Sequence, residues 1–352
     1  MRADRDEGAS GFGQALAAFF GRLWEPGADQ KQNQDRELVA DLTDMIVDTV
    51  ERRVRARGDY RQRLEPCVRA TVSCLRELGR MPLDPVLLAR ASWGPDPCIN
   101  AFFGRAEEIP ALLGRCRELR AFFEHPANAM ATEAFALLGM QREERTVFAP
   151  SLENGVLMQD VAQTTVNFTG HRLLAPSATL EQVRLEAGKR LMLRLAQLTL
   201  GRVLEIDDPG LPDAQRKHLR AVRSRLLRLV RDGVGSFSED PTILAQRIEG
   251  ARRELEHAFD TKSRLATLDG CIAQIEEVFG HPANHVALER TQLHLSRMNV
   301  KVKPGSAEPH QVLQLSELRV GEQLKAVIAF VRCPRAELPA PEDLLAKAER
   351  FL

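Results

Sequence analysis

A four-residue motif, His-Pro-Ala-Asn, occurs twice in this chain and constrains its fold more than any other feature. It occupies residues 125–128 and 281–284, and a phenylalanine lies two residues before each copy, at a constant offset of 156 residues. At the same offset Glu133 matches Glu289. A fixed offset shared by several matches is typical of an internal duplication. The sequence therefore predicts two related units, one following the other along the chain.

Helical and strand-like patterns alternate in both predicted units. Apolar residues recur every three or four positions through residues 37–78 and 179–205, as they do in amphipathic helices. Short segments rich in β-branched and aromatic residues follow the first motif, and Asn154-Gly155 between two of them is a hairpin signal. We expect a mainly α fold with small antiparallel β elements, of the α+β class, built on a duplicated helix-then-strand unit.

The predicted organisation has four parts, which differ in composition and periodicity. They are an amphipathic segment with a polar tether at 1–36, a first helix-strand unit at 37–176, a second at 177–340, and a C-terminal helix at 341–352.

The repeated motif itself has two readings. Proline at the first position of a helix costs no hydrogen bond, so the motif predicts a helix start, with a helix over 127–138 in the first copy. The histidine would then satisfy a free backbone amide. The alternative is a ligand site near His125, His281 and His285. Because Ala129 stands where the second copy has His285, a duplicated metal site would have lost a ligand, and we expect no metal and no cofactor.

The amino-terminal segment contains many large apolar residues at helical spacing within a short stretch. A polar run that ends at Arg36 follows it and would act as a tether. Such a segment suits a groove on a partner protein, although a helix packed on its own domain would show the same pattern. The predicted partner-binding residues are Phe12, Leu16, Phe19, Phe20, Leu23 and Trp24.

A basic helix is predicted at 214–231, with no acidic residue after Asp213 and before Asp232. It could contact an anionic membrane surface or a phosphate backbone, or it could be neutralised by the glutamates of the next helix. The formal net charge of zero argues against a dedicated nucleic-acid binder. The predicted anion-binding residues are Arg216, Arg220, Arg223 and Arg228.

Motifs of nucleophilic, nucleotide-dependent and dinucleotide-dependent catalysis are absent from the sequence. The six cysteines form no Cys-x-x-Cys pair and are expected to be reduced thiols in the cytoplasm. The leading hypothesis is a non-catalytic cytoplasmic binding or scaffold protein that acts through contacts with another protein. The alternatives are an enzyme or small-ligand-binding protein with a site between the two repeat units, and a peripheral contact with the inner membrane or nucleic acid through the basic helix.

Overall fold

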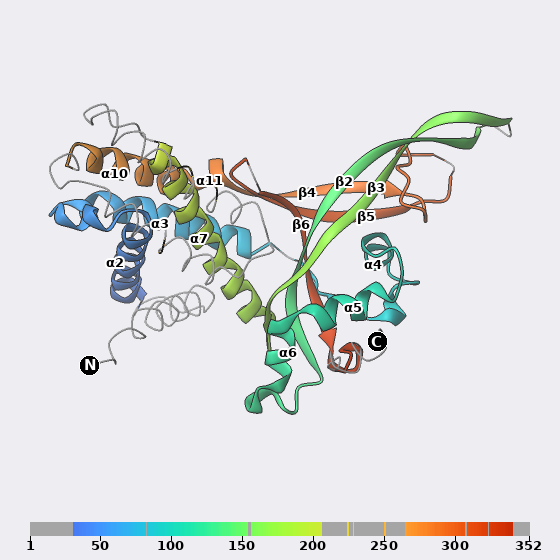
Figure 1. Cartoon of the computed structure of the whole chain (residues 1–352), viewed down its shortest axis with the longest axis horizontal. Coiled ribbons are helices and arrows are strands. Elements are labelled where there is room, and N and C mark those ends of the chain that lie inside the picture. The colour runs from blue at the N-terminus through green and yellow to red at the C-terminus, as the bar shows by residue number, and fades with distance from the viewer. Residues whose placement is uncertain are drawn as a thin grey trace, which may run out of the picture. The chain divides into compact units, whose positions relative to one another are not determined.

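The fold is described from a computed structural model of the chain (Figure 1). It describes residues 31–81, 83–153, 156–205, 265–306, 308–322 and 324–340, together with residues 224, 228 and 250. The chain divides into two compact units, each made of segments that are distant in sequence. The first, which we call the helical unit, comprises Met1–Met81, Arg184–Ala287 and Arg319–Leu324. The second, the sheet unit, comprises Pro82–Val183, Leu288–Leu318 and Lys325–Leu352.

These units are interleaved along the chain, whereas the units predicted from the duplication, 37–176 and 177–340, are contiguous. The compact units and the predicted repeat units are therefore different divisions of the chain, and the duplication stays a prediction. The mixed α+β class is confirmed by the helices and the six-stranded sheet.

The helical unit is built on amphipathic helices whose apolar faces pack together. Its described elements are α2 (Lys31–Val50), η1 (Arg52–Ala56), α3 (Tyr60–Gly79), most of α7 (Leu180–Glu205), α10 (Leu265–Gly280) and α11 (Pro282–His285). The side chains of Ile46, Leu64 and Phe279 are fully buried. The hydroxyl of Thr71 in α3 donates to the carbonyl of Phe279 at 2.7 Å and so satisfies a carbonyl near the end of α10.

The sheet unit is organised around a sheet of order β3-β2-β6-β5-β4, with the short β1 pairing parallel to β6. The strands are β1 (Val86–Leu87), β2 (Glu133–Glu153), β3 (Val156–Ser177), β4 (Val286–Leu295), β5 (Gln311–Val320) and β6 (Leu324–Pro334). Helices α4 (Pro97–Phe102), α5 (Glu108–Arg115) and α6 (Arg117–Glu124) and the short turns η2 (Arg90–Ser92), η3 (Pro126–Asn128) and η4 (Arg335–Glu337) complete it. One buried apolar cluster joins residues of these helices to inward-facing residues of all five long strands.

The loop after β4 contacts β3 and so connects the two edge strands of the sheet. The amide of Val166 donates to the carbonyl of Asn299, and the amide of Lys301 donates to the carbonyl of Thr164, each at 2.8 Å. Between these bonds Thr165 and Val300 form a bridge. Since β3 and β4 are the outermost strands of the order, these contacts curl the sheet around its apolar cluster.

Three bulges twist the long pair formed by β2 and β3. At each register shift, β3 contributes one residue more than β2, and β3 has a positive φ there, at Asp160, Gly170 and Ala175. A strand can accommodate an extra residue when one residue of the bulge adopts the left-handed conformation. Such bulges increase the local right-handed twist of the strand pair. The bulges therefore let strands of 21 and 22 residues coil instead of remaining flat.

The helix predicted over 127–138 is wrong, because β2 begins at Glu133. The alternate residues Ala134, Ala136 and Leu138 are buried, and they pair with β6, which lies almost two hundred residues away in sequence. This non-local pairing overrides the helical propensity of an alanine- and leucine-rich segment. The strands of the first predicted unit are also much longer than the short strands expected.

Both copies of the repeated motif occupy the same local position. Helix α6 ends just before His125 and β2 follows η3; α10 ends just before His281 and β4 follows α11. The imidazole Nδ1 of His125 accepts the amide of Ala127 at 3.2 Å, as expected for a capping histidine, whereas His281 makes no such bond.

Replacing Asn299 tests how its side chain holds the loop after β4 against α4. Asn299 has φ of 55°, and its side-chain amide donates to the carbonyl of Ala101 at 2.8 Å. We expect Asn299→Ala to lower the free energy of unfolding by about 2 kcal/mol, since it loses this bond and forces an unsuitable residue into the left-handed region. Asn299→Gly should cost about 1 kcal/mol, because it loses only the bond. If urea unfolding shows the same loss of stability in Asn299→Ala and Asn299→Gly, the left-handed conformation of Asn299 does not contribute as expected.

Among the described helices, none combines the length and the apolar character needed to cross a bilayer.

Candidate functional site

The most unusual feature of the sheet unit is a two-stranded ribbon formed by β2 and β3. Strand β2 pairs with β6 only from Glu133 to Met140, whereas it pairs with β3 along almost its whole length. Within the described sheet, residues 141–153 of β2 pair with β3 and no longer with β6. In Figure 1 these two green strands continue past the ends of the other strands of the unit. We call residues 141–153 and 156–169 the ribbon.

The ribbon presents apolar side chains on both of its faces. Phe148 is 71% exposed and Val147 is 38% exposed, and as neighbours in a strand they point to opposite faces. Nearer the sheet the ribbon carries charges: Arg145 pairs with Glu143 at 2.9 Å, and Lys301 pairs with Glu144 at 2.6 Å. Charges along an edge strand hinder uncontrolled strand pairing. The ribbon thus combines a charged base with an exposed aromatic side chain farther out.

A buried carboxylate anchors the base of the ribbon to the sheet. Glu317 in β5 is 4% exposed and forms ion pairs with Arg142 of β2 and Lys325 of β6, the latter at 3.2 Å. Arg142 also approaches Glu144, at 3.6 Å. The Arg142 contact is a close ion pair without the alignment of a hydrogen bond. Three strands that share one carboxylate fix the point at which the ribbon leaves the sheet.

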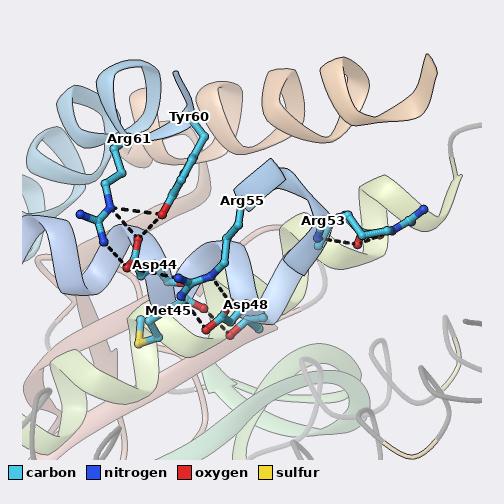
Figure 2. Close-up of polar contacts among 9 residues, drawn as sticks. Asp44, Met45, Asp48, Arg53, Arg55, Tyr60 and Arg61 are labelled. Atoms are coloured by element: carbon cyan, nitrogen blue, oxygen red, sulfur yellow. Dashed lines mark hydrogen bonds and ion pairs between the residues drawn. The ribbon is translucent and has the colours of Figure 1, made fainter. Parts of the chain in front are cut away.

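A second polar cluster lies in the helical unit, at the corner formed by α2, η1 and α3 (Figure 2). The Asp44 carboxylate accepts the Tyr60 hydroxyl at 2.7 Å and the Nε of Arg61 at 3.0 Å. Arg55 reaches both Asp44, at 3.4 Å, and Asp48, at 2.7 Å. Figure 2 shows these side chains converging on Asp44, which lies between Arg61 and Arg55.

The electrostatics of this corner favour a structural role. Burial opposes ionisation of Asp44, but hydrogen bonds from Arg61 and Tyr60 outweigh it, so the pKa of Asp44 lies below its usual value. Burial and the Asp44 carboxylate together raise the pKa of Tyr60. Both groups therefore keep their ordinary charge states at neutral pH and use their polar atoms within the corner. We interpret the cluster as a clamp between α2 and α3.

The three histidines proposed as ligands occupy different environments. His125 is exposed in the sheet unit and caps η3. His281 is exposed in the helical unit, while His285 is 5% exposed there, with Nε2 3.3 Å from a Glu277 oxygen. Glu277 also pairs with Arg202 of α7. His285 is therefore the buried member of a partly exposed polar network that sequence spacing did not reveal.

His285 should make the protein less stable in mild acid. Burial lowers the pKa of His285 below its usual value of about 6.5, although Glu277 opposes the shift. The unfolded chain then binds a proton that the folded chain does not, so the free energy of unfolding falls as the pH drops below about 6.5, by at most about 1.4 kcal/mol per pH unit. Denaturant titrations from pH 7.5 to 5 measure the slope.

The control for this experiment is the exposed His281. The variant His285→Gln should reduce the pH dependence, whereas His281→Gln should retain it. Parallel curves for the natural chain and His285→Gln would contradict the assignment. His171 in the sheet unit, whose pKa burial also lowers, contributes equally to all three proteins and cancels in the comparison.

The other predicted site residues lie mostly outside the described residues. This holds for the six apolar residues from Phe12 to Trp24 and for Arg216, Arg220 and Arg223, as well as for the predicted helix at 341–352. Arg228 is described, and it is helical and exposed. Its Nε donates to the carbonyl of Ser224 at 3.4 Å.

Within the ranges that the structure describes, no three His, Cys, Asp or Glu side chains come close enough together to hold a metal ion. All six cysteines are free thiols. Comparison with protein families, curated proteins and solved structures gives no match to this chain.

Proposed function

We propose that this chain is a non-catalytic binding or scaffold protein that acts through contacts with another protein, and that the ribbon makes the main contact. The observation that supports the proposal is the ribbon itself, which carries an exposed Phe148 on a strand pair that extends beyond β6.

The ribbon has two properties that favour binding to a partner protein. A two-stranded antiparallel pair is marginally stable in water by itself, and three or more strands or a packed face are needed for independent stability. Residues 141–149 of β2 present a strand edge that is not paired with β6. An extended segment of another protein could add to this edge, with main-chain bonds supplying affinity and an apolar pocket for Phe148 supplying specificity.

The charges on the ribbon narrow the class of partner. Glu143 and Arg145 lie on one face, and Glu144, which pairs with Lys301, lies on the other, so both signs are present on both faces. A phosphate backbone or an anionic membrane would be met by acidic side chains as well as basic ones. The proposed partner is therefore a protein segment of mixed charge with an apolar side chain that covers Phe148.

Site-specific photo-cross-linking in the cells that produce the protein tests this proposal. A benzophenone side chain replaces Phe148 in one full-length variant and Met298 in another. Met298 is 82% exposed and lies in the turn after β4, so it is a matched exposed control. We expect a discrete cross-linked protein from position 148 that position 298 does not give. Equal labelling at both positions, or none at position 148, would overturn the proposal.

The amino-terminal segment and the duplication remain part of this proposal. We propose that Phe12 to Trp24 provides a second, tethered contact, which deletion of residues 1–36 would remove. The shared order of helix, His-Pro-Ala-Asn and strand in both copies supports an ancestral duplication of the helix-then-strand unit. The cytoplasm is the proposed compartment.

A further inference from the structure

The hydrogen bonds of β3 show which main-chain groups of β2 point to the free edge of the ribbon. The amide of Val166 and the carbonyl of Thr164 bond to the loop after β4, so both point away from β2. Because these directions alternate along a strand, the main-chain groups of Thr165 point toward β2, where Thr165 pairs with Arg145. The even-numbered residues on either side of Arg145 therefore direct their main-chain groups to the free edge: Glu144, Thr146 and Phe148.

The same edge carries the two exposed apolar side chains of the ribbon. Val147 and Phe148 are neighbours in β2, so they point to opposite faces. A partner that binds this edge has to satisfy the main-chain groups and also cover one apolar side chain on each face. A strand with exposed apolar residues at two successive positions meets both conditions, and β2 of a second copy is such a strand.

We propose that the ribbon pairs with the ribbon of a second copy of this chain, β2 against β2, about a two-fold axis at Val147. This inference rests on the proposed function, since it names the partner that binds the free edge. Antiparallel pairing of two identical strands generates a two-fold axis, which is the commonest symmetry of oligomers. It also joins two marginal two-stranded ribbons into a four-stranded antiparallel sheet, which has the number of strands that independent stability requires.

Charged residues exclude an axis closer to the base of the ribbon. An axis at Glu144 or at Arg145 would place that residue opposite its own copy, and directly opposed like charges are destabilising. An axis at Thr146 would place Arg145 opposite Val147 of the second copy. It would also place Glu144 opposite Phe148, so each exposed apolar side chain would face a charge.

An axis at Val147 matches the side chains on both faces. Val147 then lies opposite its own copy on one face. On the other face Thr146 lies opposite Phe148 of the second copy, and aromatic and β-branched residues form favourable cross-strand pairs. Arg145 lies opposite Ala149, so its charge faces a small apolar residue and not a like charge.

Proline disfavours an axis farther out along the ribbon. An axis at Phe148 would place Thr146 opposite Pro150, which has no amide hydrogen, so a bond next to the centre would be lost on each side. With the axis at Val147, Pro150 lies opposite Glu144. The missing bond then falls farther from the centre of the pairing.

Disulfide trapping of the purified full chain tests the position of the axis. Val147 would form a pair without main-chain hydrogen bonds, with its Cα about 4.5 Å from that of its copy, a distance that a disulfide spans. We expect Val147→Cys to give a covalent dimer on mild oxidation. Arg145→Cys is the control, because its copy would lie four residues away along the strand, about 13 Å.

The six native thiols are present in both variants, so their background is the same. Equal dimer formation by Val147→Cys and Arg145→Cys, or none by Val147→Cys, would overturn the proposed pairing.

Sedimentation equilibrium tests the association itself. We expect the natural chain to be in a monomer–dimer equilibrium in the micromolar range, since a short strand edge is a small interface. Val147→Glu should weaken the dimer by at least about a hundredfold, because it places two like charges at the axis. Val312→Glu is the matched control: Val312 is 46% exposed in β5, away from the ribbon, and its replacement should leave the association unchanged.

A natural chain that stays monomeric throughout this range would overturn the inference, as would equal association of Val147→Glu and Val312→Glu. These outcomes leave the proposed function standing, because its test uses cells. There, a cross-linked product from position 148 that contains two copies of this chain would support the inference. A product that contains a different protein would overturn the inference and support the proposed function.

Discussion

The variant Glu317→Ala is expected to lower the free energy of unfolding by about 3–5 kcal/mol, the largest effect that the structure predicts for a single substitution. Glu317 is buried between Arg142 and Lys325. Its removal leaves the mostly buried guanidinium of Arg142 without its main counter-charge, whereas the more exposed Lys325 can be solvated by water. Denaturant unfolding of the full chain measures the change.

Two further variants show whether charge or volume causes this loss. Glu143→Ala removes a more exposed carboxylate from β2 and should cost less than about 1 kcal/mol. The double variant Arg142→Leu and Glu317→Leu should recover much of the stability lost in Glu317→Ala, because replacing a whole buried pair is tolerated better than breaking it. If Glu317→Ala and Glu143→Ala cost the same, the buried pair does not anchor the ribbon.

The variant Gly321→Ala should lower the free energy of unfolding by about 2–3 kcal/mol. Gly321, in the turn between β5 and β6, has φ of +58°, and a methyl group there would lie 2.5 Å from Cδ1 of Leu198. Its amide also donates to the carbonyl of His285 at 2.7 Å, so the turn cannot move away without breaking this bond.

Gly305→Ala is the matched control for this prediction. Gly305 also has a positive φ, of +83°, but nothing lies within 4 Å of the position that a methyl group would take. Gly305→Ala should lower the free energy of unfolding by only about 1–2 kcal/mol, because the one unfavourable change is an alanine at a positive φ. The same loss of stability in both variants, measured by urea titration, would contradict a steric role for Leu198.

Local features of the fold could be predicted from the sequence because they depend on nearby residues. The apolar periodicity of residues 37–78 and 179–205 correctly predicted α3 and α7. Asn154-Gly155 correctly predicted a hairpin, since β2 ends at Glu153 and β3 begins at Val156. In each case turn chemistry or helical spacing within about twenty residues was sufficient.

Features that depend on distant residues could not be predicted in this way. The segment 127–138 reads as a helix until it is paired with β6, and nothing nearby indicates that pairing. Glu317 is an ordinary acidic residue in the sequence, and its partner Arg142 is far away along the chain. The ribbon was missed for a related reason: the sequence predicts strand-like segments after the first motif, but the exposure of Val147 and Phe148 depends on where β6 stops pairing with β2.

The most direct test of the account compares the full chain with a ribbon-shortened variant. In this variant residues 147–163 are removed, and Thr146 is joined to its cross-strand neighbour Thr164 through an Asn-Gly turn. The buried cluster of the sheet unit uses β2 only up to Met140 and β3 only from Val166, so the variant should fold as the full chain does. The measurement is the affinity of each protein for the partner that cross-links to position 148. The account predicts a loss of at least about a hundredfold on shortening, which corresponds to about 2.7 kcal/mol of binding free energy. An unchanged affinity in a folded, shortened chain would contradict it.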